Sequence, residues 1–391
     1  MEHSDYLSIH PGTAVTRCIL DRLQSPDDGL KIIHIAGTNG KGSTAEFFTR
    51  ILISAGKKVG TFTSPAVYDF YDQFKVDSKP LSAETAEKYF DTAHKASEGL
   101  NATDFEIQTA GIIYAFFKEG CEYAVIECGM GGLNDATNAI HKKQLAVITS
   151  VSLEHTAYLG NTIEEICTQK AGIITKDCPA IINAHQGKEV KGFFKGCKFA
   201  DKLDGIYDGG FIYDGKRFTL NANGILQPHN AATAIEGCRL IGIDEKTIYE
   251  GIKNAQPRGR LEKFEVGGRT YILDGAHNPA AFEPLKEYLK QYSEDLTLIY
   301  GSLYDKDIDG NLKILSCLTD RIIAVECKSL RKTALEKTES ICRKYFKNVS
   351  TASSVSDALN NASTKTAAVC GSFTLLTEAK QWIENLTGKR Q

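Results

Sequence analysis

The sequence predicts an α/β protein built from two doubly wound domains. Continuous apolar runs alternate with helical stretches along most of the chain, which is typical of mainly parallel strands covered by helices on both faces. Closely spaced Asp, Gly and aromatic residues at about 199–226 indicate a small antiparallel annex. The stretch 256–261 contains Pro and Gly and is expected to be a linker. We therefore expect an N-terminal domain at 1–255 and a smaller Rossmann-like domain at 262–391.

Composition narrows the classes of function. The chain has 391 residues and a formal net charge of −3, which fits two domains and argues against a nucleic-acid partner held by a basic surface. No apolar run approaches the roughly 18–20 residues that span a bilayer, so no membrane partner is expected. Residues 1–5 lack a basic start and an apolar core, so we expect a cytoplasmic protein without a signal peptide. Eleven cysteines occur without a CxxC pair, which indicates reduced, buried thiols rather than a zinc site.

The expected elements follow from apolar runs and from helix start and stop signals. An apolar run ending at Ala36 is the first strand, and Gly56 marks the end of the next helix. Further strands of the N-terminal domain are expected at 59–63, 123–128, 145–150 and 179–184, and helices at 46–55, 83–97, 106–118, 162–171 and 230–241. In the C-terminal domain, strands are expected at 270–273, 296–300, 322–326 and 367–370.

A glycine-rich loop follows the first strand, with the sequence Gly37-Thr38-Asn39-Gly40-Lys41-Gly42-Ser43-Thr44. Glycines let the backbone approach a polyphosphate, and the N-terminus of the following helix directs free N–H groups toward it. Lys41 would place a positive charge near the terminal phosphates, and Ser43 or Thr44 could reach a phosphate or its metal ion. The spacing is not that of a Walker A loop, because Gly42 intervenes between Lys41 and Ser43. The alternative interpretation is a plain glycine turn between a strand and a helix.

Polar side chains follow several strands of the N-terminal sheet, at the edge where parallel sheets bind ligands. Ser64 and Glu127 each end a strand, His155 follows another strand, and Lys170 lies on the next helix. Magnesium accepts hydroxyl, carboxylate and phosphate oxygens, and a shared cation would neutralise a carboxylate at the end of a buried strand. The sequence therefore predicts a metal site beside the phosphate loop. Alternatively, Glu127 is a helix cap or an ion-pair partner, and His155 is a structural histidine.

The C-terminal domain repeats this arrangement at 271–279, where a strand ends in Asp274 and a glycine turn leads into a helix. Asp274 could bind a ribose hydroxyl, and His277 could contact phosphate or substrate. Arg258 and Arg260, in the expected linker, could reach phosphates. The alternative interpretations are a strand–turn–helix with an Asn cap and two solvated arginines.

The ordered motifs resemble those of the folylpolyglutamate synthase/dihydrofolate synthase family, relatives of the Mur ligases. The phosphate loop, with its extra glycine between Lys41 and Ser43, is the first match. The other matches keep the family's order and extend the resemblance over about residues 30–380. They lie at 63–65, 127–132, 135–138, 154–156, 169–174, 229–232, 258–262, 274–279 and 371–372.

The resemblance implies an ATP-dependent amide ligase. ATP would phosphorylate a carboxylate to an acyl phosphate, and the amine of L-glutamate would then displace the phosphate to give an amide and ADP. The small-molecule substrates would be a folate or pteroate, L-glutamate and ATP. Mg²⁺ is the implied cofactor, with a monovalent cation as a further candidate, and we expect a monomer.

The resemblance also implies roles for single residues. Ser64, Glu127 and His155 would hold magnesium, and Lys170 matches a lysine that the family carbamylates, which would turn an amine into a carboxylate-like ligand. The residues matched to ATP are Thr38, Asn39, Gly40, Lys41, Gly42, Ser43, Thr44, Asn230, Arg260 and Asp274. The catalytic candidates are Lys41, Lys170 and His277, and the candidate substrate contacts are Phe105 and Asp135.

The sequence departs from the family's pattern in the segment that is expected to bind the carboxylate acceptor. Residues 66–76 carry acids and aromatics where the family usually has an apolar pair and an Arg-containing loop. These aromatic side chains could stack on a pterin, or they could simply pack the loop against the rest of the protein. Three alternatives therefore stand beside a folate ligase: an amide ligase of this family with a different acceptor, a kinase or NTPase, and a non-catalytic relative.

Overall fold

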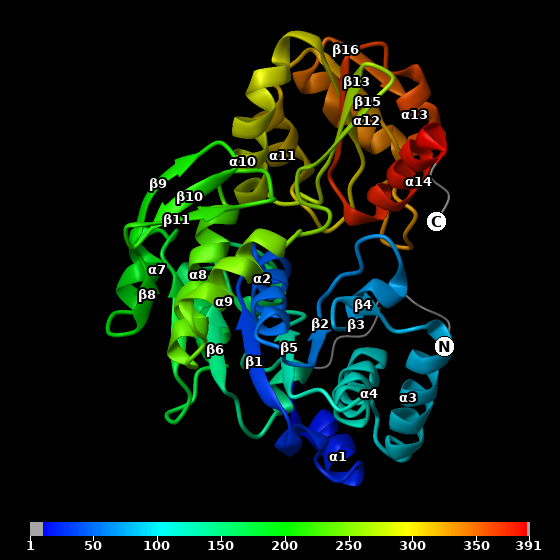
Figure 1. The fold of residues 1–391 in the computed structure, drawn as a ribbon. Coiled ribbons are helices and arrows are strands. Elements are labelled where there is room, and N and C mark those ends of the chain that lie inside the picture. Colours follow the sequence, from blue (N-terminus) through cyan, green and yellow to red (C-terminus); the bar gives the residue numbers. More distant parts are fainter. Residues whose placement is uncertain (1–10, 389–391) are drawn as a thin grey trace. The chain divides into compact units, whose positions relative to one another are not determined.

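The computed structural model describes residues 11–388 and divides the chain into two compact units, each with its own sheet (Figure 1). Unit 1 comprises the described residues up to Ala66, then Phe70–Asn221 and Leu226–Pro257. Unit 2 comprises Val67–Asp69, Ala222–Ile225 and the chain from Arg258 onward. Two short segments thus belong to unit 2 although their neighbours in the sequence belong to unit 1. Residues 1–5, on which the expectation about a signal peptide rests, lie outside the described residues.

An eight-stranded sheet forms the centre of unit 1, in the order β4-β3-β2-β5-β1-β6-β7-β8. Its inner strands pair in parallel, and only the pairings of β3 with β2 and with β4 are antiparallel. Strands β2, β5 and β6 are buried along their whole length, as expected of a sheet covered on both faces. The strands are β1 (Lys31–Ala36), β2 (Val59–Phe62), β3 (Phe74–Val76), β4 (Lys79–Pro80), β5 (Tyr123–Glu127), β6 (Leu145–Ile148), β7 (Ala180–Asn183) and β8 (Lys198–Ala200).

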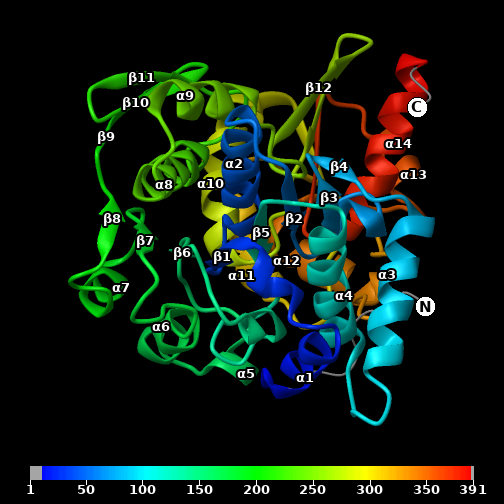
Figure 2. The same ribbon diagram turned by 60° about the horizontal axis from the view of Figure 1, so that its bottom comes forward.

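Helices cover both faces of this sheet (Figures 1 and 2). On one face, Phe116 of α4 packs against Gly60 of β2, and on the other, Thr49 of α2 hydrogen-bonds Thr61 of β2 at 2.7 Å. A threonine–glutamate capping box begins both α4 and α6. The helices are α1 (Ala14–Arg22), α2 (Lys41–Ser54), α3 (Ala83–Ala96), α4 (Asp104–Lys118), α5 (Thr156–Leu159), α6 (Ile163–Ala171), α7 (Lys188–Phe193), α8 (Gln227–Leu240) and α9 (Glu245–Asn254), with 3-10 turns η1 (Pro26–Gly29), η2 (Phe70–Gln73) and η3 (Ala136–Ala139).

The annex of unit 1 is a separate antiparallel sheet in the order β11-β10-β9. Its strands are β9 (Leu203–Tyr207), β10 (Gly210–Tyr213) and β11 (Lys216–Thr219). Phe211 and Phe218 are buried on one face with ring centroids 5.3 Å apart, whereas Ile206 is exposed. The antiparallel sheet is shorter than the expected 199–226, because Phe199 lies in β8, the outermost strand of the main sheet.

A six-stranded sheet forms unit 2, in the order β12-β13-β17-β14-β15-β16, with only β12 antiparallel. Alternate residues of β14 face opposite cores: Leu298 and Tyr300 pack with α10, α11 and α12, and Ile299 packs with α13 and α14. The strands are β12 (Glu262–Val266), β13 (Arg269–Leu273), β14 (Leu296–Tyr300), β15 (Arg321–Ala324), β16 (Asn348–Thr351) and β17 (Thr366–Cys370). The helices are α10 (Pro279–Leu289), α11 (Ile308–Leu315), α12 (Leu335–Tyr345), α13 (Val355–Asn361) and α14 (Leu376–Thr387), with 3-10 turns η4 (Lys290–Asp295) and η5 (Phe373–Leu375).

The cysteines of the structure are all free thiols. Cys18 in unit 1 and Cys317 in unit 2 are exposed, Cys197 is partly exposed, and the other eight are buried. Burial raises the pKa of buried thiols such as Cys238 and Cys370. In the part of the chain that the structure describes, we find no helix with the length and apolar character that crossing a membrane requires.

Candidate active site

The phosphate loop connects β1 to α2, and its first glycines are required by close packing. Gly40 has φ +88°, and a Cβ at this position would lie 2.6 Å from Oδ1 of Asn230 on α8. Gly37 has φ +152°, and a Cβ there would lie 1.8 Å from Oγ1 of Thr149. A side chain at either position would therefore displace the loop, because glycine alone combines this backbone with this space.

The segment after β6 holds the phosphate loop in place. The Thr38 N–H donates to the Ser150 carbonyl at 2.7 Å, and the Thr38 hydroxyl donates to the Ser152 carbonyl at 3.1 Å. In return, the Ser150 hydroxyl donates to the Asn39 carbonyl at 3.1 Å. The loop is thus fixed before α2 begins at Lys41, and the free N–H groups of the first turn of α2 have a defined direction.

A buried carboxylate lies next to this loop. Glu127, at the end of β5, is 4 % exposed, and its Oε1 lies 3.7 Å from the Lys41 ammonium. Its Oε2 accepts the backbone N–H of Ser64 at 3.3 Å. A Cβ at Gly42 would lie 3.4 Å from the same Oε2, so the glycine between Lys41 and Ser43 keeps the space beside the carboxylate open. The structure therefore brings together Lys41, Ser64 and Glu127 as the sequence predicts.

These residues fit a phosphate chain with a hard divalent cation. Carboxylate and hydroxyl oxygens from Glu127 and Ser64 are the donor types that Mg²⁺ prefers. Oγ1 of Thr44, in the first turn of α2, is buried and has no hydrogen-bond partner among residues 11–388. The Ser43 hydroxyl accepts from the side chain of Gln227 at 3.3 Å, which directs it within the loop.

His155 occupies a strained position at the start of α5. Its φ of +51° places it in the left-handed region, where non-glycine residues are uncommon and often functional. Its Nε2 lies 3.9 Å from Oε1 of Glu154, so an acid and an imidazole adjoin here. The predicted metal role of His155 remains a prediction, and the strain supports a special function for this position.

Lys170 is a buried amine at the end of α6, with 2 % of its surface exposed. Burial, together with the positive charge of Lys41, lowers the pKa of Lys170 to about 7. A large fraction of this amine is therefore uncharged near neutral pH and able to act as a nucleophile.

The glycine-rich segment after β5 holds the turn that carries Lys170. The Leu133 N–H donates to the Gln169 carbonyl at 2.6 Å, and the Asn138 amide donates to the Gly172 carbonyl at 3.2 Å. The Lys143 ammonium donates to the Ile173 carbonyl at 3.0 Å and to Oδ1 of Asn138 at 2.6 Å. A cation at a helix C-terminus is favoured by the helix dipole. Lys143 could not be identified from the sequence, because one lysine in a polar turn carries no signal of its own.

A shallow, partly open pocket with room for about one water molecule adjoins the phosphate loop on the side of α8. Its lining residues are Asn39, Gly40, Ser150, Asn183, His185, Leu226, His229 and Asn230. The rings of His185 and His229 lie 4.5 Å apart. Burial lowers the pKa of His185 and lowers that of His229 to about 4, so both rings are neutral at pH 7. Asn230, predicted to lie on the adenine side, is thus in a pocket directly beside the loop.

Of the two candidate substrate contacts in unit 1, Asp135 is buried and Phe105 is partly buried. The Phe105 ring packs against Gly129 and lies 6.1 Å from the ring of Phe62. Asp135 accepts the N–H of Met130 at 2.7 Å and that of Thr137 at 3.0 Å, and burial raises its pKa. Asp135 therefore shapes the turn after β5, and its contact with substrate remains a prediction.

A buried polar cluster that the sequence analysis missed lies beneath this turn. Nε2 of His34, in the middle of β1, lies 2.8 Å from the Thr137 hydroxyl and 3.1 Å from the Cys128 sulfur. Burial lowers the pKa of His34 well below its usual value, so the ring is neutral. The run of apolar residues around His34 predicts a buried strand and gives no sign of its partners.

The aromatic residues of the loop after Ser64 are largely packed into the protein. Phe74 is fully buried in β3, where its ring lies 5.6 Å from Phe62 and 5.0 Å from Phe90. Phe70 packs against the same core, and the Tyr71 hydroxyl donates to Glu87 at 3.1 Å. Phe74 therefore supports loop packing rather than stacking on a ligand.

Unit 2 holds a second group of predicted site residues. Asp274, at the end of β13, is buried and accepts the N–H of Leu261 at 2.9 Å and that of Ala276 at 2.7 Å. Burial raises its pKa, and the neighbouring charges of Arg260 and His277 oppose this shift. Nδ1 of His277 lies 2.8 Å from the Gly275 carbonyl. The structure thus groups Arg260, Asp274 and His277.

The segment expected to be a linker is an ordered loop of unit 2 from Arg258 onward. The Arg260 guanidinium lies 4.6 Å above the centre of the Phe373 ring, so this arginine is held and not simply solvated. Leu261 has φ +48°, a conformation that costs a non-glycine residue free energy. Arg258 is exposed.

Comparison with family models defines the class of protein. Residues 35–198 match the Mur ligase middle domain, and residues 259–373 match the Mur ligase glutamate ligase domain. The chain is therefore a Mur-type ligase, an enzyme class that forms C–N bonds.

Similar proteins assign the chain to one family within this class. The chain is 30 % identical over 349 residues to the dihydrofolate synthase/folylpolyglutamate synthase of Bacillus subtilis, covering 80 % of each chain. It is 34 % identical over 353 residues to a probable bifunctional folylpolyglutamate synthase/dihydropteroate synthase of Haloferax volcanii, covering 82 % of this chain but only 41 % of that longer protein. The chain belongs to the folylpolyglutamate synthase/dihydrofolate synthase family.

Solved structures agree with this assignment. The Mycobacterium tuberculosis folylpolyglutamate synthase complexed with ADP and AMPPCP has a TM-score of 0.86 and 27 % identity, with 95 % of both chains covered. A bifunctional folylpolyglutamate synthase/dihydrofolate synthase with Mn, AMPPNP and L-glutamate bound has a TM-score of 0.84 and 25 % identity, covering 96 % of this chain and 95 % of that one. The fold and the resemblance stated from the sequence are thereby confirmed, and ATP and a divalent metal belong to the chemistry of this family.

Proposed function

We propose that this protein adds L-glutamate to a folate-type carboxylate, as a folylpolyglutamate synthase, a dihydrofolate synthase or both. The observation that carries the proposal is the group formed by Lys41, Ser64 and Glu127 beside a phosphate loop whose Gly42 leaves room for the carboxylate. In the reaction, a substrate carboxylate oxygen attacks the γ-phosphorus of ATP and ADP departs. The glutamate amine then attacks the acyl phosphate, and phosphate departs as the amide forms.

Positioning and charge neutralisation are the main tasks of the residues in unit 1. The N–H groups at the start of α2 and the Lys41 ammonium would bind the phosphates. Ser64, Glu127 and His155 would hold Mg²⁺, which when bound withdraws charge from the phosphoryl oxygens. The adenine would lie next to Gly40 on the side of α8, with Asn230 as its polar contact.

The buried amine of Lys170 supports carbamylation. A carbamate forms when an uncharged amine attacks CO₂ and loses a proton, and burial keeps much of this amine uncharged near pH 7. The resulting anion would satisfy the buried position better than an ammonium and would lie near the Lys41 cation. We assign Lys170 this role, with a monovalent cation as a further candidate cofactor.

In unit 2, Arg260 and Asp274 would contact the nucleotide, and His277 would contact phosphate or the incoming glutamate. Burial raises the pKa of Asp274, and the neighbouring Arg260 guanidinium opposes this shift, so the carboxyl group and the guanidinium lie close enough to act on the same ligand.

A second candidate is a ligase of the same family with another carboxylate acceptor. The observation in its favour is the divergent loop at 66–76, in which Phe74 is buried in the core and Tyr71 bonds to Glu87. These contacts leave fewer aromatic residues of the loop for stacking on a pterin than the sequence suggests.

Phosphate release measured across a panel of acceptors tests both candidates. The panel contains dihydropteroate, tetrahydrofolate and unrelated carboxylates, each with and without L-glutamate in the presence of Mg²⁺ and ATP. We expect phosphate release only when a pteridine carboxylate and glutamate are both present.

Other outcomes of the panel separate the rivals. Phosphate release with an unrelated carboxylate and no response to either folate substrate would favour the second candidate and contradict the first. Phosphate release without any amine would indicate an NTPase, and a phosphorylated product that persists would indicate a kinase.

A further inference from the structure

Tyr68 connects the divergent loop to unit 2. It lies in the segment Val67–Asp69, which belongs to unit 2, and it follows the predicted metal ligand Ser64 by four residues. Its hydroxyl donates to Oε1 of Glu262, and its carbonyl accepts the Thr377 hydroxyl at 2.8 Å. The ammonium of Lys380 lies 4.0 Å from the centre of its ring. Hydrogen bonds and a cation–π contact therefore hold this one residue in unit 2.

Glu262 connects Tyr68 to the loop that carries Arg260. The same Oε1 that accepts the Tyr68 hydroxyl also accepts the backbone N–H of Gly259. A Cβ at Gly259, whose φ is +65°, would lie 2.7 Å from Cγ1 of Val67, so the two segments are in close contact. Tyr68, Glu262 and Gly259 thus form a continuous chain of contacts that ends one residue before Arg260.

The loop at 258–262 needs such support because its conformation is strained. Leu261 has φ +48°, a left-handed conformation that is strained for a non-glycine residue. Its N–H is bound by Asp274 and its carbonyl accepts the side-chain amide of Asn223 at 2.9 Å. These contacts hold Leu261 directly next to Arg260, whose guanidinium lies over the Phe373 ring.

We propose that Tyr68 is a positioning residue for Arg260: its phenol holds Glu262, Glu262 holds the Gly259 amide, and the loop so fixed presents Arg260 to the nucleotide. The inference rests on the nucleotide contact of Arg260 in the proposed function.

Nucleotide binding in the absence of any acceptor tests this role. Affinity for Mg-AMPPNP is measured by calorimetry on the full-length protein and on Tyr68→Phe, with thermal unfolding as a check on the fold. We expect Tyr68→Phe to weaken binding by about tenfold, the effect of one lost hydrogen bond to a charged group. Tyr71→Phe is the matched control, because it removes a tyrosine–glutamate bond from the same loop within unit 1.

A double variant distinguishes positioning from general support. If Tyr68 acts through Arg260, then Tyr68→Phe adds no further loss to Arg260→Ala, whereas independent effects would add. Unchanged affinity in Tyr68→Phe, an equal loss in Tyr71→Phe, or additive losses in the double variant would each overturn the proposal.

Thr377→Val provides a second test of the proposal if the Tyr68→Phe variant does not fold. It removes the hydroxyl that binds the Tyr68 carbonyl, and a smaller loss of affinity in the same direction is expected. Unchanged affinity in Thr377→Val would then overturn the proposal. A failure to find folate-dependent turnover would leave these binding constants as they are, so the inference and the proposed function fail separately.

Discussion

At the scale of single residues, Lys170 combines two properties that seldom occur together, burial of almost the whole side chain and an ionisable amine. A buried ammonium costs free energy, and the structure responds by lowering the pKa of the amine. A lysine at this position therefore lowers the stability of the folded chain, which indicates that the residue has a function there. Carbamylation would replace the amine by an anion that the nearby Lys41 cation stabilises.

Lys170→Met is predicted to separate stability from activity. We expect turnover to fall by about 100- to 1,000-fold, as when one preorganised charged group is lost from an active site. Lys142→Met, at an exposed lysine of unit 1, is the control and should keep normal turnover. Near-normal rates in Lys170→Met would remove this residue from the site.

The pH dependence of stability follows from the same amine. Its pKa is about 7 in the folded chain against 10.5 for an ordinary lysine, so the unfolded chain takes up this proton first as the pH falls. In CO₂-free buffer, the free energy of unfolding of Lys170→Met should therefore exceed that of the wild type by a margin that grows from about pH 10.5 to about pH 7 and then levels off. Chemical denaturation at several pH values measures this, and a constant difference would contradict a buried neutral amine.

Single residues also show what sequence can and cannot predict. Lys41, Ser64 and Glu127 could be placed together, because each lies at a strand end or a phosphate loop whose geometry is general. The contact of Tyr68 with Glu262 could not, because it joins residues 194 positions apart and depends on the folded path of the chain. The burial of Lys170 is likewise a property of packing and leaves no mark in its local sequence.

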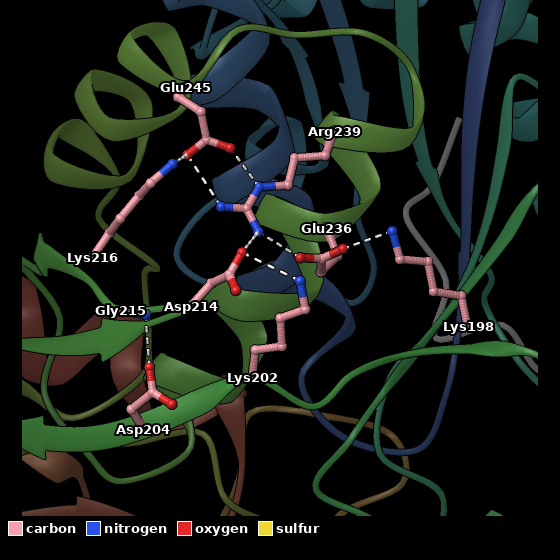
Figure 3. Close-up of polar contacts among 9 residues, drawn as sticks. All are labelled: Lys198, Lys202, Asp204, Asp214, Gly215, Lys216, Glu236, Arg239 and Glu245. Carbon is pink, nitrogen blue, oxygen red and sulfur yellow. Dashed lines mark hydrogen bonds and ion pairs between the residues drawn. The ribbon is translucent and has the colours of Figure 1, made fainter.

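At the scale of elements, a charged network fastens the annex of unit 1 to α8 and α9 (Figure 3). Arg239 of α8 bonds to Glu236 at 2.5 Å, to Glu245 at 2.5 Å and to Asp214 at 3.2 Å. Glu236 is 2 % exposed and also pairs with Lys198 at 2.7 Å. Burial raises the pKa of Glu236, but the bonds from Lys198 and Arg239 outweigh this and lower it.

Arg239→Met is predicted to destabilise unit 1 by about 2 kcal/mol or more, because it leaves a buried carboxylate with fewer partners while keeping the apolar stem. Thermal or denaturant unfolding measures the loss. Arg217→Met is the control, since Arg217 is exposed on β11 and stacks over Tyr207, and its replacement should cost less than about 1 kcal/mol. Equal losses of stability in both variants would show that the charged network stabilises unit 1 no more than an exposed arginine does.

Most elements lie where the apolar pattern predicts them, and the differences have physical causes. Helix α2 begins at Lys41 rather than at 46, since the phosphate loop leads directly into it. Helix α8 begins at Gln227 rather than at 230, and Pro228 fits its first turn because no N–H is needed there. The edge strands β4, β8, β12 and β16, and β3 next to β4, were not predicted, because short, partly exposed strands lack a continuous apolar run.

At the scale of the whole molecule, unit 2 is assembled from three separate parts of the chain. The segments Val67–Asp69 and Ala222–Ile225 each contribute a side chain that supports the loop at 258–262. The units therefore differ from domains joined by one linker, because the chain passes between them several times.

Asn223→Ala is predicted to destabilise the loop at 258–262, although residue 223 lies well before this loop in the sequence. Loss of the amide bond to the Leu261 carbonyl should speed hydrogen exchange in peptides covering 258–262. Asn221→Ala, which removes a similar bond to the Lys253 carbonyl within unit 1, should leave those peptides unchanged. Exchange mass spectrometry measures both, and unchanged exchange in Asn223→Ala would mean that residue 223 does not support the strained Leu261.

The distribution of free thiols gives this molecule a built-in pair of labelling sites. Cys18 and Cys317 are exposed and lie one in each unit, while eight other thiols are buried. Thiol-reactive dyes should therefore attach to the native sequence mainly at one point per unit, with Cys197 as the slower third site. Energy transfer between two such dyes would measure the separation of one labelled point in each unit, without any engineered cysteine.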